Sequence, residues 1–93
     1  MKFYTTFKIN KSFDRWLKLV DELQPHMDKY ENKMMFACTN NEETRVWDMG
    51  ETNNADFVTD FLNDLEVINM RKEAGLDLES SEVFSMISKH KIW

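Results

Sequence analysis

One segment of this 93-residue chain, Lys33–Thr39 with the sequence KMMFACT, has the residue types of a β-strand but is apolar on both of its faces. The apolar side chains divide between the two faces, with Met34, Phe36 and Cys38 on one and Met35 and Ala37 on the other. The segment 82–88, EVFSMIS, repeats the pattern, with Val83 and Ile87 opposite Phe84 and Met86. A strand that is apolar on both faces needs cover on both. We therefore expect a sheet with neither face left in water.

The first part of the chain predicts a strand followed by a helix. Residues 3–9 alternate with the period of two that is typical of a strand. Ser12 then offers a hydroxyl for a helix N-cap. The helix has apolar side chains at helical spacing, namely Phe13, Trp16, Leu17, Val20 and Leu23. Pro25 should stop or kink this helix, although Met27 and Tyr30 continue its apolar phase for about one further turn.

The middle of the chain predicts a β-hairpin and a polar link. The residues Asn40-Asn41-Glu42-Glu43 form a turn cluster between the KMMFACT strand and a further strand at residues 44–49. Residues 50–54, GETNN, are then expected to be a link that ends in good N-cap candidates.

A second helix follows, marked by apolar side chains at helical spacing: Phe57, Val58, Phe61, Leu62 and Leu65. Asn63-Asp64 is expected to interrupt this helix, which resumes over residues 65–74. Gly75 should take the left-handed conformation that ends a helix, and Arg71 and Lys72 should complement the helix dipole near that end. The acidic run 77–82 is then expected to be a solvated turn that leads to the last strand.

The order strand, helix, strand, strand, helix, strand defines the expected fold class. It is α+β, a ferredoxin-like βαββαβ antiparallel sheet with both helices on one face. Residues 1–88 form a single domain, and residues 89–93 a C-terminal tail. The other face of this sheet is apolar and uncovered, so a second copy is expected to stack its sheet on it by two-fold symmetry. The prediction is a homodimer through the sheet faces, which forms a dimeric α+β barrel.

Composition excludes several classes of partner and compartment. Lys and Arg total 12 against 17 Asp and Glu, a net charge of −5, and the basic residues form no stripe, so neither a nucleic acid nor an anionic membrane surface is an expected partner. Cys38 is the only cysteine, so no internal disulfide forms. No apolar run has the length of a signal peptide or a membrane span, and we expect a cytoplasmic location.

Two longer stretches resemble a known superfamily. The runs TTFKINKSFDRWLKLVDE and FLNDLEVINMRKEAGLDLESSEVFSMI are similar to the dimeric α+β barrel superfamily, and more narrowly to its small stand-alone bacterial members of unknown function, including those of marine cyanobacteria. The superfamily includes monooxygenases that act on aromatic polyketides, haem-degrading enzymes, isomerases, cyclases and members without known activity. The resemblance implies the fold and the homodimer, and it leaves the activity open.

The site residues of the related enzymes are only partly present. Haem-degrading members use an Asn, a Trp and a His on the second helix; Asn10 and Trp47 match the first two, but no His occurs between Asn54 and Gly75. The cyclase-like members use a His on a strand, whereas His26 and His90 lie elsewhere. The spacing of His and Cys gives no metal cluster, and two glycines give no phosphate loop. No metal and no cofactor are therefore expected.

The resemblance also implies that a ligand would lie between the sheet and the helices. The candidate ligand-binding residues are Trp16, His26, Tyr30 and Trp47, for which simple packing or solvation is the competing interpretation. One hypothesis is a small dimeric ligand-binding or regulatory domain. The alternative is a cofactor-independent oxygenase, isomerase or cyclase that acts on a small hydrophobic or aromatic substrate. A cavity of ~300 Å³ or more with convergent polar groups would favour the enzyme; filling by Phe and Met would favour the binding domain.

The terminal tail carries a separate prediction. Ile92 and Trp93 follow an apolar strand and are costly to leave in water. We expect them to pack on the partner subunit or on the helices of their own subunit.

Overall fold

Four strands form one antiparallel sheet in the order β2-β3-β1-β4. The computed structural model describes all 93 residues. The strands are β1 (Lys2–Ile9), β2 (Asn32–Thr39), β3 (Arg45–Thr52) and β4 (Leu76–Ile87). The two central strands, β1 and β3, pair from Lys2 opposite Glu51 to Lys8 opposite Arg45.

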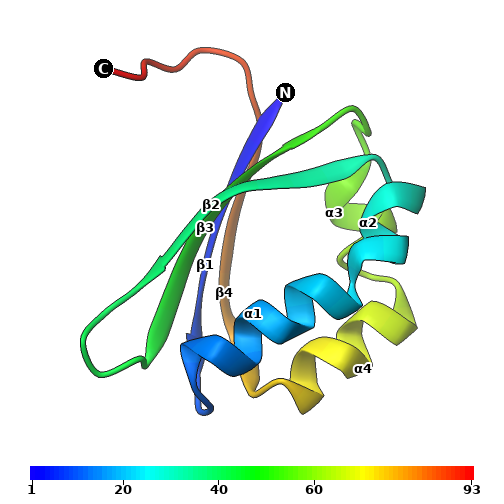
Figure 1. Ribbon diagram of the computed structural model, residues 1–93. Helices are drawn as coiled ribbons and strands as arrows, with labels where there is room; N and C mark the ends of the chain where they lie inside the picture. Colours follow the sequence, from blue (N-terminus) through cyan, green and yellow to red (C-terminus); the bar gives the residue numbers. More distant parts are fainter.

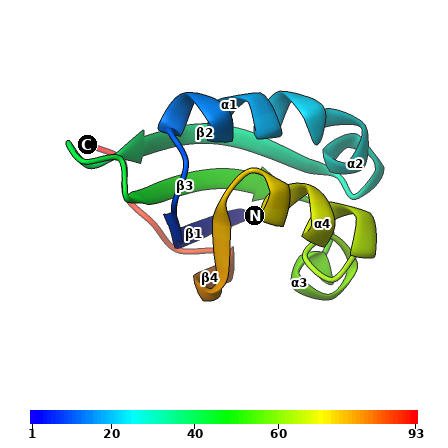
Figure 2. The same cartoon turned by 90° about the horizontal axis from the view of Figure 1, so that it is seen from below.

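Four helices lie together on one face of this sheet, as Figures 1 and 2 show. They are α1 (Phe13–Glu22), α2 (Gln24–Lys29), α3 (Phe57–Asp60) and α4 (Leu65–Glu73). The chain is thus a small α+β fold, and the expected antiparallel sheet with helices on a single face is confirmed. None of these helices has both the length and the apolar composition that crossing a lipid bilayer requires.

The first helix begins where the sequence predicts. The Ser12 hydroxyl accepts a hydrogen bond from the Arg15 backbone N–H at 3.1 Å, which satisfies one of the free donors of the first turn. The predicted apolar stripe needs one correction. Leu17 is 41% exposed, whereas Leu19, which was not in the stripe, is 2% exposed and packs in the core. The buried face follows the spacing from Trp16 to Leu19, Val20 and Leu23.

Pro25 divides the first helical region as predicted. It lies in the first turn of α2, where a missing N–H costs nothing because that N–H would have no partner inside the helix. The predicted interruption of the second helix at Asn63-Asp64 also forms, between α3 and α4. Asp64 caps α4 by accepting hydrogen bonds from the N–H groups of Glu66 and Val67. Gly75 follows α4 with a φ of +92°, the left-handed conformation that glycine adopts without strain.

Two strands are longer than the sequence predicts. β3 extends to Thr52, so Gly50 lies within a strand and not in a link. The Phe3 ring occupies the space beside Gly50, so a Cβ at this position would lie only 2.4 Å from Phe3 Cζ. β4 begins at Leu76, so the acidic run 77–82 is part of an edge strand and not a solvated turn. Its pairing with β1 is irregular, shifting register between Thr6 and Lys8.

A β-bulge changes which residues of β2 face the helices. Register shifts between Met34, opposite Gly50, and Phe36, opposite Met49. Met34 therefore faces the helices with Ala37, while Phe36 and Cys38 face the other side of the sheet. The prediction that Met34 shares a face with Phe36 is wrong, because the extra residue at the bulge inverts the alternation.

The C-terminal tail runs away from both layers (Figure 1). Ile92 and Trp93 are exposed, so packing of the tail on its own helices does not occur. Packing on a partner subunit stays a prediction.

Candidate functional site

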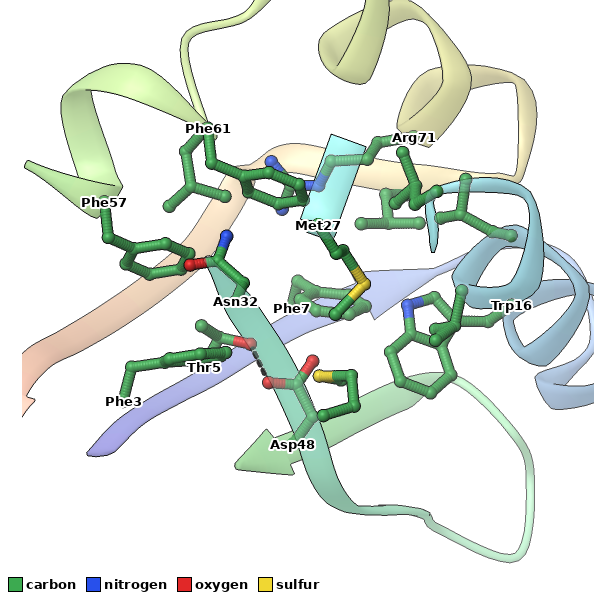
Figure 3. A pocket seen from close by; sticks show the side chains of 16 residues that line it. Phe3, Thr5, Phe7, Trp16, Met27, Asn32, Asp48, Phe57, Phe61 and Arg71 are labelled. Carbon is green, nitrogen blue, oxygen red and sulfur yellow. Dashed lines mark hydrogen bonds between the residues drawn. The ribbon is translucent and has the colours of Figure 1, made fainter. Parts of the chain in front are cut away.

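A small cavity lies between the sheet and the helical layer. Its volume is about 60 Å³, and 12 of its 16 lining residues are hydrophobic. The remaining four are Thr5, Asn32, Asp48 and Arg71 (Figure 3). Polar groups in such a position are informative, because burying a polar group costs free energy unless it finds a partner.

Asp48 enters the cavity from the sheet. Alternation along β3 turns Val46, Asp48, Gly50 and Thr52 toward the helices. Directly opposite in the ladder lies Thr5, whose hydroxyl donates to Asp48 Oδ1 at 2.5 Å. Asp48 is only 4% exposed. Burial raises its pKa from 3.8 to about 6, and the Thr5 hydrogen bond and the Arg71 charge act in the opposite direction. Oδ2 has no hydrogen-bond partner in the protein.

Arg71 enters the cavity from the helical layer. It lies on the same side of α4 as Val67, four residues before it, and as the C-cap Ala74, three residues after it, and it is 9% exposed. Its guanidinium carbon lies 5.9 Å from the centroid of the Phe7 ring, a cation–π contact. Burial lowers the pKa of Arg71, and the charge of Asp48 opposes that shift. Arg71 thus lies in the last turn of α4, as predicted, and its side chain also lines the cavity.

The two charged groups in the cavity do not touch. No nitrogen of Arg71 lies within 4.0 Å of a carboxylate oxygen of Asp48, and the guanidinium donates no hydrogen bond to the protein. Planar guanidinium groups that are buried in proteins ordinarily engage a carboxylate or carbonyl directly. The cavity thus holds a buried donor and a buried acceptor that face the same space without pairing.

Asn32 adds a buried amide that has no hydrogen-bond partner. It is the first residue of β2 and is 5% exposed, yet neither the oxygen nor the nitrogen of its side-chain amide makes a hydrogen bond. Figure 3 shows the amide on the side of the cavity where Phe57 and Phe61 lie. An amide offers two donors and one acceptor oxygen, so all of its hydrogen-bonding capacity is available to a molecule in the cavity.

Of the four residues that the sequence proposed for ligand binding, the cavity includes only Trp16. His26 and Tyr30 connect α2 with the beginning of α4 instead. The Tyr30 hydroxyl donates to Asp64 Oδ2 at 2.7 Å, and His26 Nε2 lies 3.4 Å from Glu66 Oε1. The hydrogen bond between Tyr30 and Asp64 raises the pKa of the phenol and lowers that of the carboxyl.

Trp47 lies on the other face of the sheet. It pairs with Thr6 on one side and Cys38 on the other, and both point away from the helices. Trp47 therefore does not line the cavity. The alternation of β3 explains the outcome, because Trp47 lies between Val46 and Asp48, the two neighbours that face the helices.

The open face carries a continuous apolar row that crosses all four strands. Register places Phe36 opposite Met49, Met49 opposite Tyr4, and Tyr4 opposite Phe84. The rings of Tyr4 and Phe84 are 6.0 Å apart, and Phe36 and Phe84 are each 58% exposed. We call these four side chains the apolar row. Large aromatic groups in this number are unusual on a free surface.

Three of the residues that define the cavity were missed from the sequence: Asn32, Asp48 and Arg71. One signal for Asp48 was available, since a carboxylate inside a predicted strand at the phase of Val46 indicates burial. Arg71 also shares the helical phase of Val67 and Ala74. Asn32 carried no comparable signal, because a polar residue just before a strand is most often solvated.

Comparison with known proteins supports the fold and goes no further. No protein-family model matches this chain, and no curated protein matches it. Among solved structures, the chain is similar to a structural genomics target, protein YJCS. The TM-score is 0.52 with 19% sequence identity, over 94% of this chain and 100% of that one. This likeness supports a small α+β fold with a four-stranded antiparallel sheet.

Proposed function

We propose that this protein is a homodimer that binds a small molecule in the cavity between its sheet and its helices. The observation that carries the proposal is the buried Asn32 amide, which has no hydrogen-bond partner and lines the same cavity as Asp48 and Arg71. A buried polar group left unsatisfied costs about 1–3 kcal/mol, and Asn32 leaves both ends of its amide unsatisfied. A bound molecule that pairs with them would recover this cost.

The size of the cavity favours a binding or regulatory role over the alternative enzymes. At about 60 Å³ it is far smaller than the ~300 Å³ typical of a pocket for a drug-sized or aromatic substrate. Phe and Met side chains fill much of the space beside it, among them Phe3, Phe7 and Met27. An oxygenase or cyclase for an aromatic substrate would need this region to be reshaped.

The homodimer and the ferredoxin-like arrangement belong to the same proposal. Strand order β2-β3-β1-β4 with helices between β1 and β2 and between β3 and β4 is compatible with a ferredoxin-like βαββαβ unit. The apolar row supports a second copy stacked on the open face, because two copies related by a two-fold axis would each cover the other's row. Ile92 and Trp93, exposed in the tail that follows β4, would then pack on the partner.

The dimer is tested by the molar mass of the protein in solution. Light scattering should give twice the mass of the 11.2-kDa chain, and Phe36→Glu should give the single-chain mass, since a carboxylate would be buried at the centre of the interface. Leu65→Glu is the matched control, because Leu65 is also exposed but lies on α4. A wild-type mass of one chain at micromolar concentration would reject the dimer.

Ligand binding is tested separately by a melting-shift screen of chemically diverse small molecules of about three to six non-hydrogen atoms. At least one compound should raise the melting temperature of the wild type and not that of Asn32→Leu. That substitution keeps the branched shape and the number of non-hydrogen atoms of the side chain and removes the unpaired amide. If no compound in the set raises the melting temperature, the binding function is wrong.

A second candidate, proton transfer, follows from Asp48. A buried carboxylate with a pKa of about 6 is suited to act as a general base near neutral pH, and the guanidinium of Arg71 would stabilise negative charge on a carbonyl oxygen. The chemistry would be an isomerisation of a small hydroxycarbonyl compound. Deuterium exchange from D₂O into glycolaldehyde, followed by NMR, should be faster with the wild type than with Asp48→Asn; equal rates would exclude this candidate.

A further inference from the structure

We propose that the molecule held in this cavity has no net charge and two opposite poles: an acceptor group, such as a carboxylate or an amide carbonyl, at Arg71, and a donor group, such as an ammonium or an amide NH₂, at Asp48. The inference rests on the proposed function, because it presumes that the cavity binds a ligand. It specifies the chemical class of that ligand, either a small zwitterionic amino acid or a small neutral amide.

Charge balance excludes ligands with one pole. The cavity encloses one guanidinium and one carboxylate, both buried and more than 4.0 Å apart. A simple anion would pair with Arg71 but would place a second negative charge near Asp48. A simple cation would pair with Asp48 but would place a second positive charge near Arg71. Either ligand leaves an uncompensated charge out of water, which is costly in a low-dielectric site. A dipolar molecule pairs with both groups and adds no net charge.

The geometry places the two poles on opposite sides of the ligand. Asp48 comes from the sheet and Arg71 from the helical layer, as Figure 3 shows. Asp48 Oδ1 already accepts from Thr5, so Oδ2 is the atom free to accept from a donor. The guanidinium of Arg71 has its N–H groups free for a carboxylate or carbonyl. Asn32 supplies both a donor and an acceptor to the same cavity.

The volume restricts the ligand to very few atoms. One water molecule needs about 10–15 Å³ of such cavity space, so a cavity of about 60 Å³ holds a molecule of about four to six non-hydrogen atoms at most. Glycine and acetamide are of this size and represent the zwitterion and the neutral amide. The apolar walls, Phe7 and Trp16 among them, exclude water around the bound poles and thereby strengthen both contacts.

The experiment compares four molecules of similar size by calorimetric titration and melting shift at one fixed ionic strength. Glycine and acetamide carry both poles, whereas acetate carries only the acceptor and methylammonium only the donor. At least one two-pole molecule should raise the melting temperature by about 5–10 °C at about ten times its dissociation constant. Each one-pole molecule should bind at least about tenfold more weakly, since it leaves one buried charge unpaired. The tighter binder of glycine and acetamide shows whether the ligand is a zwitterionic amino acid or a neutral amide.

Two variants are compared, so that a loss of binding can be told apart from a failure to fold. Arg71→Met removes the guanidinium that pairs with the acceptor group of the ligand and should abolish binding, but it also removes a buried charge. Asn32→Leu removes only an amide without partners, so the protein should melt at the same or a higher temperature while binding weakens by about tenfold.

Three results would overturn the inference: acetate or methylammonium binding as tightly as the two-pole molecules, no binding by either two-pole molecule, or binding that Asn32→Leu leaves unchanged. If other compounds in the diverse screen do bind while glycine and acetamide do not, the chemical class is wrong and the binding function stands. If nothing in that screen binds, both are wrong and the cavity holds only water.

Discussion

Replacing Asp48 by Asn should stabilise the protein at neutral pH, which is unusual for a change at a buried, hydrogen-bonded group. The reason lies in its pKa, which burial raises from 3.8 to about 6. One pKa unit corresponds to about 1.4 kcal/mol, so ionised Asp48 weakens the folded state by about 3 kcal/mol relative to its protonated form. The asparagine amide oxygen still accepts from Thr5, and the side chain carries no charge to bury.

The sign of the pH dependence follows from proton counting. Between pH 3.8 and about 6 the folded protein holds a proton on Asp48 that the unfolded chain has released. The unfolded state then binds fewer protons, so the free energy of unfolding falls as the pH rises through this interval. The stabilisation that the folded state gains from the proton on Asp48 is fully present below pH 3.8 and is lost by about pH 6 to 7.

The assay is urea unfolding of the wild type and Asp48→Asn at a series of pH values from 4 to 8. The variant should be about 1–3 kcal/mol more stable at pH 7, and the difference should shrink toward zero near pH 4. The other carboxylates titrate in both proteins and largely cancel in the comparison. Asp21→Asn is the control, since Asp21 is exposed and its replacement changes the net charge equally. A variant less stable than the wild type at pH 7, or a difference independent of pH, would refute the reasoning.

Three further changes test other parts of the structure. Gly75→Val should lower the free energy of unfolding by about 1–2 kcal/mol or more in a urea titration, because it imposes a side chain on a φ of +92°; an unchanged midpoint would contradict this. Gly50→Ala should cost about 1–3 kcal/mol in the same assay, since its Cβ would lie 2.4 Å from Phe3 Cζ, and a Phe3→Leu background should recover part of the loss. Deleting Ile92 and Trp93 should lower the melting temperature and weaken the dimer at low protein concentration, and no change in either would mean that the tail does not reach the partner.

Much of the fold was predictable because its signals are local. Ser12 caps α1, Asp64 caps α4, and Gly75 ends α4, each through contacts within a few residues of the position that carries the signal. The break at Pro25 is equally local, because the ring constrains the chain on which it sits. The sequence thus located the elements to within a few residues in most places.

The candidate site was far less predictable. Asp48 and Arg71 lie on different elements, and their common cavity exists only because the β1–β3 register sets Thr5 opposite Asp48 while α4 packs over the same place. His26 and Tyr30 were expected at a ligand and instead bind the first turns of α4. Aromatic residue type by itself does not say which of two apolar faces a side chain joins, and Trp47 shows the consequence.

What the sequence determined by itself was the set of elements and the presence of two apolar faces. Apolar periodicity, helix caps and helix-breaking residues act over one turn or one strand, so they can be recognised in the sequence without knowledge of the fold. Only the tertiary structure decided which side chains occupy each face, because the bulge between Met34 and Phe36 inverts the alternation and the close approach of Phe3 to Gly50 depends on pairing between distant segments. The buried polar groups of the cavity arise from those same long-range pairings, and no local pattern encodes them.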